Sequence, residues 1–148
     1  MGLIVNRPTE HKLVDAITEM PKRATQNLYW GGPVQQRMVL VLHRHAEDAP
    51  DTTPVTRGMA LGTSHDALKH LLETLPQPEK RLRVYSGYAG WAAGQLHNEM
   101  EQHSWILSPA DPKLVFDVEP NAVWGRALAQ LGPRYAHLTT MPADPRVN

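Results

Sequence analysis

The sequence predicts a single α/β (α+β) domain, with a mixed β-sheet flanked by three to four helices. Short apolar runs alternate along the chain with segments of helical period, which is the pattern of a sheet covered by helices. Thirteen prolines and ten glycines interrupt these segments, so long helices are not expected. A length of 148 residues suits one domain over residues 1–148, with enough chain for a core without disulfides.

Composition excludes several classes of protein. The absence of cysteine excludes disulfides, thiolate metal sites and a thiol nucleophile. Basic and acidic residues number 15 each, so a broad surface for nucleic acid is not expected. No apolar run approaches the ~20 residues that cross a bilayer. We therefore expect a cytoplasmic protein without direct nucleic-acid binding, membrane insertion, cofactor or metal.

The beginning of the chain predicts two strands around a helix. Residues 2–5 are apolar and branched, which favours a buried strand. Apolar residues recur at helical spacing over residues 13–20, and Pro21 ends that helix. Residues 28–30 predict a second strand, which leads into the turn-forming residues 31–33.

The middle of the chain predicts the centre of the sheet and the clearest helix. Residues 38–42 are continuously apolar, which indicates a strand covered on both faces. A short strand is expected at residues 59–61. Thr63 and Asp66 resemble a capping box ahead of a leucine stripe over residues 68–75, which predicts a helix.

The last part of the chain predicts short elements. Residues 82–85 alternate between apolar and polar, as in a half-exposed strand. The further expected elements are a turn feeding a helix (87–103), two short strands (105–107 and 114–116), a last helix (123–131) and a loosely held tail (133–148).

Two glycine-rich segments form the candidate ligand-binding site. A helix that begins at Gly90 would place Gly90 and Gly94 one turn apart, which would leave a stripe of backbone without side chains. Its first turn would present unpaired N–H groups to an anion. Gly31-Gly32 suits an anion-binding nest, although a turn explains it with fewer assumptions. Close packing, with Trp91 in the core, is favoured over ligand binding. The candidate residues are Gly31, Gly32, Pro33, Gly87, Tyr88, Gly90, Trp91, Gly94 and Gln95. A further hypothesis is that both segments converge on one cleft.

Other chemically active patterns are weak. His43, His45 and Glu47 would share one face of an extended strand, a set that suits a divalent cation, but a solvated strand end is the favoured interpretation. The basic cluster at residues 80–83 is too small for the phosphate contacts that nucleic-acid binding needs. Ser86 lies outside any G-x-S-x-G motif. The sequence therefore names no catalytic residue.

Several sequence phrases occur in a characteristic order. They are GLIVNRP at 2–8, GGPV at 31–34, LH at 42–43, TS at 63–64 and GYAGWAAGQL at 87–96, followed by Glu99, Trp105, PAD at 109–111, FD at 116–117 and Trp124. Together they resemble the YqgE/AlgH family of bacterial proteins over nearly all of residues 2–132. His97 stands where an acidic residue is usual, and the chain after Gly132 departs from the common pattern.

The resemblance implies a curled mixed sheet flanked by helices, and a regulatory protein without an established reaction. Family members carry the label of transcriptional regulators, so an indirect role through a protein or small-molecule partner is expected. The alternative is an enzyme with an unrecognised site at residues 31–33 and 87–95. Members normally carry two strands before the position of Met1. A chain without them would expose a strand edge at residues 2–5, so we expect homo-oligomers, strand exchange or marginal stability.

Overall fold

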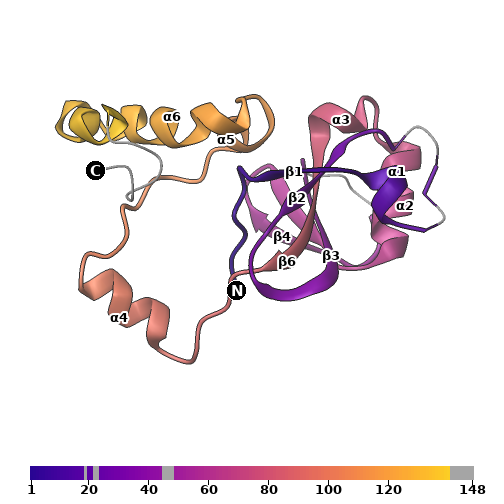
Figure 1. The fold of residues 1–148 in the computed structure, drawn as a ribbon, viewed down its shortest axis with the longest axis horizontal. Helices are drawn as coiled ribbons and strands as arrows, with labels where there is room; N and C mark the ends of the chain where they lie inside the picture. Colours follow the sequence, from indigo (N-terminus) through magenta and orange to yellow (C-terminus); the bar gives the residue numbers. More distant parts are fainter. Residues whose placement is uncertain (19, 22–23, 45–48, 141–148) are drawn as a thin grey trace.

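A six-stranded mixed sheet forms the centre of the computed structural model, which describes residues 1–18, 20–21, 24–44 and 49–140 (Figure 1). The strands are β1 (Pro8–Lys12), β2 (Asn27–Trp30), β3 (Val34–Arg44), β4 (Thr52–Thr56), β5 (Met59–Gly62) and β6 (Leu82–Tyr88). They lie in the order β1-β2-β6-β3-β5-β4. Only β2 and β6 run parallel among the described neighbours, which confirms a mixed sheet.

Six α-helices occur in the described ranges, more than the three to four expected. They are α1 (Leu13–Ala16), α2 (His65–Thr74), α3 (Pro78–Arg81), α4 (Gln95–Glu101), α5 (Pro112–Phe116) and α6 (Val123–Gln130), with 3-10 segments η1 (Pro120–Ala122) and η2 (Pro133–Thr140). α1, α3 and α5 have only four or five residues each. Within the described residues, no helix combines the length and the apolar character that a membrane span requires.

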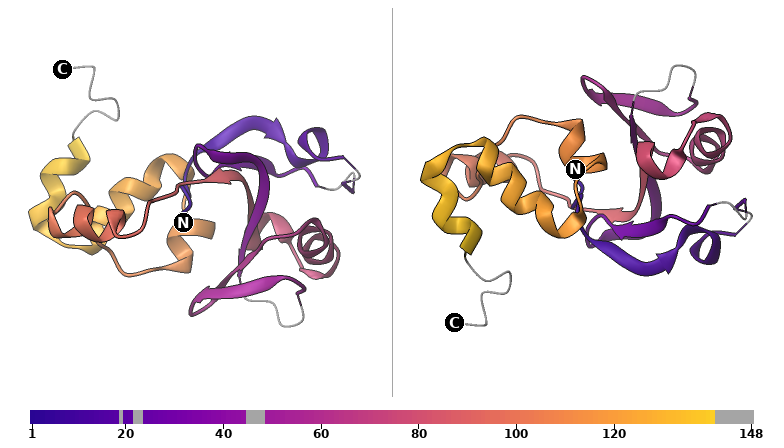
Figure 2. Two further views of the ribbon diagram at one scale, coloured as in Figure 1. Left: turned by 90° about the horizontal axis from the view of Figure 1, so that it is seen from below. Right: turned by 90° about the horizontal axis from the view of Figure 1, so that it is seen from above.

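The sheet is buried on both faces, as the apolar run in β3 predicts. Val39 and Val41 pack on the face that α1 and α2 cover, whereas Leu40 and Leu42 pack on the opposite face. That second face is covered by α5 and by residues 3–5. The sheet is strongly twisted between these layers (Figure 2).

The leucine-rich helix α2 is confirmed, with a cap one residue later than expected. The Ser64 Oγ accepts a hydrogen bond from the Ala67 N–H at 3.0 Å, so Ser64 rather than Thr63 is the N-cap. Leu68, Leu71 and Leu72 are buried against the sheet. The stripe of leucines therefore fixes the helix to the face that contains Val41.

The strands predicted at residues 2–5 and 114–116 are wrong. Residues 2–5 form only an isolated bridge between Gly2 and Ala89, together with a hydrogen bond from the Ile4 N–H to the Gly31 carbonyl. Residues 114–116 belong to α5, because an Asp111 carboxylate oxygen accepts from the Lys113 N–H at 2.9 Å and Pro112 occupies the first turn.

Three other segments also differ from the sequence-based expectation. Residues 105–107 lie in neither a helix nor a strand. The helix that begins at Leu13 ends at Ala16, well before Pro21. Residues 133–140 form η2, whereas residues 141–148 of the expected loose tail lie outside the described residues.

The chain between β6 and α5 leaves the sheet as an arm (residues 89–111) that carries α4 (Figure 1). The arm lies apart from the helices α1 and α2, and the layer of α5, α6 and η2 follows it. Residues 101–110 are all exposed, and they include the apolar side chains of Trp105, Ile106 and Leu107. The arm thus contrasts with the buried sheet that precedes it.

Candidate functional site

The two glycine-rich segments meet at residues 31–32 and 87–89, whereas a cleft formed by both of them stays a prediction. The Gly31 N–H donates to the Ser86 carbonyl at 2.9 Å, which brings the end of β2 against the end of β6. A Cβ at Gly31 would lie 2.3 Å from the Gly87 carbonyl oxygen, and one at Gly32 would lie 2.1 Å from the Tyr88 carbonyl carbon. Backbone atoms of one segment therefore occupy the space that side chains of the other would need.

This glycine junction (residues 31–32 and 87–89) has the geometry of close packing. Gly87 has φ +70°, and its added Cβ would lie 2.5 Å from the Gly32 carbonyl oxygen. Both a left-handed backbone and the close approach thus require glycine there. The junction gives a structural reason for these residues, while ligand binding at them stays a prediction.

The expected helix start at Gly90 is wrong. Helix α4 begins at Gln95, and Gly94 is its N-cap with φ +77°. No atom lies within 4 Å of a Cβ built at Gly94, so Gly94 packs against nothing. Pro33, the remaining residue of the first segment, is exposed. The bare stripe expected from Gly90 and Gly94 is therefore not formed.

Trp91 lies on the arm rather than in the core. Its indole N–H donates to Glu99 Oε2 at 3.1 Å, and the indole N–H of Trp105 donates to the same oxygen at 2.9 Å. The two rings meet edge to face, 5.9 Å apart at 65°. The side-chain amide of Gln95 donates to Glu99 Oε1 at 2.9 Å. We call this arrangement of Trp91, Gln95, Glu99 and Trp105 the arm clamp.

The arm clamp stabilises the ionised form of Glu99. Hydrogen bonds from Trp105, then Gln95 and Trp91, hold the pKa of that carboxyl below its ordinary value. Trp91 also reaches back toward the domain, since its ring lies 3.1 Å from a Cβ built at Gly2. Sequence reasoning missed the clamp because Trp91 and Trp105 lie outside helix α4, eight and six residues from Glu99, and only Gln95 is one helical turn away from it.

Arg83 is buried beneath the second face of the sheet. Its guanidinium donates to the backbone carbonyls of Val5 and Val118, at 3.2 Å each, and lies over the ring of Tyr29 at 5.0 Å. The Tyr85 hydroxyl donates to the same Val5 carbonyl at 3.3 Å. Burial raises the pKa of Tyr85, so its hydroxyl stays protonated and able to donate.

Arg83 therefore connects residues 3–6 and 116–119 to the sheet. With 9% of its surface exposed, it is not part of a basic surface, although Lys80 and Arg81 are exposed. The cluster at residues 80–83 thus offers two surface cations rather than three. The expectation of no direct nucleic-acid binding stays a prediction.

A polar cavity of about 270 Å³ lies beside Arg83, between α3 and the turn after α5. We call it the Arg83 cavity. It is lined by Gln26, Asn27, Tyr29, Glu79, Leu82, Arg83, Phe116, Asp117, Val118, Glu119 and Pro120. Asp117 pairs with Arg44 at 2.6 Å, an ion pair at its edge.

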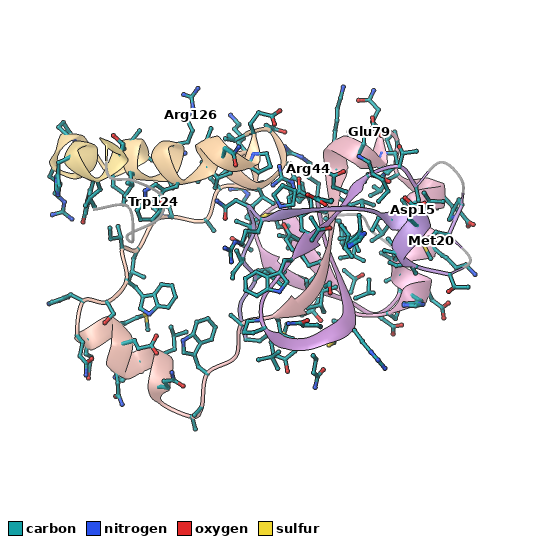
Figure 3. The ribbon with its side chains drawn as sticks, in the orientation of Figure 1. Asp15, Met20, Arg44, Glu79, Trp124 and Arg126 are labelled. Carbon is teal, nitrogen blue, oxygen red and sulfur yellow. The ribbon has the colours of Figure 1, made fainter. Side chains whose placement is uncertain are left out.

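A larger and more open groove of about 1110 Å³ lies between the N-terminal segment, α6 and η2. We call it the α6 groove. It is lined by Ile4, Asn6, Arg7, Asn121, Ala122, Trp124, Gly125, Arg126, Leu138 and Thr139. Trp124 is 53% exposed, and Figure 3 shows it on the opposite side of α6 from the end of Arg126.

The histidine pattern on β3 does not form a described metal site. His43 is buried, with its Nδ1 2.9 Å from the Arg44 carbonyl oxygen, whereas His45 and Glu47 lie outside the described residues. Across the ranges that the structure does describe, no three His, Asp or Glu side chains converge on one ion position. The end of β3 is therefore buried at His43 rather than solvated.

Relatives of this chain align with it over nearly its whole length. A UPF0301 protein of Chlorobium luteolum is 32% identical over 148 residues, which cover 100% of this chain and 78% of that protein. A UPF0301 protein of Caulobacter vibrioides is 37% identical over 146 residues, which cover 94% of this chain and 74% of that protein.

Two solved structures share the fold. The solution structure of the AlgH protein from Pseudomonas aeruginosa matches with a TM-score of 0.75 and 34% identity, covering 97% of this chain and 78% of that one. A crystal structure from Corynebacterium diphtheriae matches with a TM-score of 0.72 at 24% identity, covering 94% and 74%. The family model described as AlgH-like (DUF179) matches residues 1–136. The resemblance is thereby confirmed, and the chain belongs to the AlgH-like (YqgE/AlgH) family.

Proposed function

We propose that this protein is a non-catalytic binding domain of the cytoplasm that influences transcription indirectly, by docking a segment of a partner protein in the α6 groove. The observation that carries the proposal is the composition of that groove. The exposed indole of Trp124 shares it with Ile4, Leu138 and the cation of Arg7. Tryptophan and arginine are the residues that most often dominate protein-binding surfaces.

The groove favours a segment with an apolar anchor and acidic flanks. Among the described residues, its lining includes the side chains of Arg7, Asn6 and Asn121 and no aspartate or glutamate, whereas the end of Arg126 points to the other side of α6 from Trp124 (Figure 3). The Arg7 guanidinium lies 5.0 Å from the centre of the Trp30 ring, which fixes its position. Charge complementarity therefore selects carboxylates beside the apolar residue that meets Trp124.

The glycine junction supports this function less directly, by leaving little room for a substrate. An enzyme built on residues 31–33 and 87–95 would need space where backbone atoms already meet. The observed packing therefore favours the binding function over the enzymatic alternative.

Selection from a random-peptide display library on the full chain tests the proposal. We expect enriched peptides in which aspartate or glutamate flanks an aromatic or leucine residue. Trp124→Ala and Arg7→Gln should each abolish the enrichment, because they remove the apolar surface and the fixed cation. Arg37→Gln, a change of an exposed arginine of β3 outside the groove, is the matched control.

Two results would overturn the docking proposal. One is enrichment of basic peptides, which the charge of the groove would repel. The other is enrichment that survives both groove variants as well as it survives Arg37→Gln. Either result would place the binding surface elsewhere on the domain.

A further inference from the structure

We infer that the α6 groove of one copy of this chain holds the exposed end of the arm of a second copy, so that two copies associate by exchanging arms. This exposed end, which we call the arm tip, comprises residues 101–110, and Ile106 and Leu107 are its apolar anchors. The inference deepens the proposed function and rests on it, because it names the chain itself as a partner of the groove.

The arm tip presents apolar side chains to water on a segment that leaves the sheet (Figure 1). Its ten residues are all exposed, and the side chains of Leu107 and Ile106 are 67% and 38% exposed. The neighbouring Trp105 ring, in contrast, is held in the arm clamp. Adjacent apolar side chains that the fold leaves uncovered are typical of a surface that meets a partner.

The charges of the arm complement those of the groove. Residues 89–111 carry three carboxylates, those of Glu99, Glu101 and Asp111, and contain no lysine or arginine. The groove presents the Arg7 guanidinium, and none of its described lining residues is acidic. Opposite charges favour the correct partner and its orientation. The arm therefore supplies the apolar anchor with acidic flanks that we propose for a segment bound in the groove.

The arm is held away from the groove of its own chain. Among the described residues, none of the arm lines that groove. Ala89 exchanges two backbone hydrogen bonds with Gly2 at 2.9 Å, and the Asp111 carboxylate caps α5. Between these two ends the clamp fixes Trp105, directly before the anchors. A second copy can bind the arm tip in this arrangement, without the ordering cost of releasing it from its own clamp.

The groove has the size and the polar groups for a polypeptide segment. Its volume of about 1110 Å³ exceeds the roughly 300–1,000 Å³ of small-molecule pockets. Residues 105–107 lie in neither a helix nor a strand, and among the described residues none of their backbone N–H groups donates a hydrogen bond. The side-chain oxygens of Asn6 and Asn121 in the groove are acceptors for such donors.

Reciprocal exchange would form the same contact twice around a twofold axis. Each arm then needs to bury only about half of the roughly 1,200 Å² at which stable interfaces begin. A short exposed segment is therefore long enough to join two copies.

Sedimentation velocity of the full chain, from about 1 μM to 1 mM, tests the inference. We expect a reversible dimer. An arm variant (Ile106→Ser with Leu107→Ser) and a groove variant (Trp124→Ala) should each weaken the dimer at least about tenfold, because they remove the anchors or the apolar surface that receives them. All three side chains are exposed, so the circular dichroism spectrum should not change. Val55→Ser, at an exposed apolar side chain of β4, is the control and should leave the dimer unchanged.

Mixing the variants distinguishes arm exchange from other kinds of dimer. The arm variant keeps an intact groove, and the groove variant keeps an intact arm. An equimolar mixture should therefore form heterodimers through one remaining contact, more tightly than either variant associates alone. Raising the salt concentration to roughly 0.5 M should weaken the native dimer, because it screens the attraction between Arg7 and the carboxylates of the arm.

The random-peptide selection separates the failure of this inference from that of the proposed function. The arm variant offers a groove without a competing arm, so it should enrich acidic and apolar peptides at least as strongly as the native chain. Such enrichment, with a native chain that stays monomeric up to about 1 mM, would overturn arm exchange and leave the proposed function standing. Absence of enrichment on both chains would overturn the proposed function together with this inference.

Three further outcomes would overturn arm exchange. A dimer that survives both variants as well as it survives Val55→Ser would have its interface elsewhere. A mixture that associates no more tightly than the separate variants would mean that the arm and the groove do not meet. A monomer in which the arm variant shifts the nuclear magnetic resonance signal of the Trp124 indole would place the arm tip in the groove of its own chain.

Discussion

The sheet and the arm that leaves it are ordered by different forces. In the sheet, Leu13, Leu68 and Leu71 have no exposed surface and lie in one apolar cluster with Val41. In the arm, ten consecutive residues are exposed, and the ordered contacts gather on the Glu99 carboxylate. Apolar burial acts cooperatively over a whole domain, whereas hydrogen bonds in contact with water act locally.

This difference separates global stability from local order. Changes in the sheet should lower the free energy of unfolding, because every element of the core is removed from water together. Changes in the arm clamp should alter the environment of two tryptophans while the sheet stays folded. The following predictions test that separation, beginning with the largest expected effect.

Leu71→Ala should destabilise the whole domain by about 2–5 kcal/mol, because it leaves a cavity between α2 and the sheet. Urea unfolding followed by circular dichroism measures the effect. Val55→Ala, at a side chain that is 56% exposed, is the control and should change stability little. Equal effects of the two changes would contradict the burial described for α2.

Gly31→Ala should destabilise the domain by about 3 kcal/mol, because the added Cβ would meet the Gly87 carbonyl oxygen at 2.3 Å. Gly94→Ala is the matched control on the arm, where the Cβ would meet nothing and only the left-handed backbone is strained, at about 1–2 kcal/mol locally. Thermal unfolding of both variants checks the order. A larger loss of thermal stability in Gly94→Ala than in Gly31→Ala would contradict the interpretation of the glycine junction as close packing.

Arg83→Met should cost about 2–3 kcal/mol, because the carbonyls of Val5 and Val118 lose a charged donor while the apolar stem is retained. Hydrogen exchange of residues 3–6 and 116–119 should rise more than that of β3, since Arg83 connects those segments to the sheet. Arg37→Met, at an exposed arginine, is the control. Uniform loss of protection in all strands would contradict this local role.

Glu99→Gln should leave the midpoint of unfolding unchanged and alter tryptophan fluorescence, because it removes the charged acceptor of two indole N–H groups. Unchanged fluorescence in this variant, with Glu101→Gln as control, would mean that the clamp does not order the arm. A lowered midpoint would mean that the arm and the sheet unfold as one unit.

The same carboxylate gives the clamp a pH dependence. The pKa of Glu99 in the folded chain lies below its ordinary value of 4.5, so its ionised form favours the clamped arm above that value. The contribution is lost as pH falls through the lowered pKa. Fluorescence between about pH 7 and pH 3 should show this transition in the native sequence and lose it in Glu99→Gln.

The parts of the fold that were predictable from sequence are those that a strong apolar pattern determines. The uninterrupted apolar run in β3 identified a strand that is covered on both faces, and the leucine stripe of α2 identified the side of that helix that packs on the sheet. The edge strands β1 and β4 could not be found this way, because both are polar, contain proline and depend on a neighbouring strand for their hydrogen bonds.

Two other errors have specific physical causes. Residues 114–116 have strand-like composition, yet Asp111 and Pro112 start a helix that their short apolar run does not reveal. Trp91 was predicted to be a core residue because large aromatic rings are usually buried. In the structure its indole N–H donates a hydrogen bond to Glu99, which holds the ring on the arm.

The candidate site was predictable only in part, for the same reason. Close approach of the two glycine segments follows from residue type, because only glycine leaves that space. The Arg83 cavity and the α6 groove combine residues that lie tens of positions apart in the sequence. No local pattern encodes such a meeting, and the oligomeric state expected for residues 2–5 also stays a prediction.

The strand order carries a consequence for how the chain folds. β6 lies between β2 and β3, so the last of the described strands to leave the ribosome separates the pair β1-β2 from the three strands β3, β5 and β4. Until residue 88 has been synthesised, β2 and β3 each present an unpaired edge toward the vacant central position. Pairing at such long sequence separation is slow, so we expect a late, rate-limiting insertion of β6 and a nascent chain that depends on chaperones before that step.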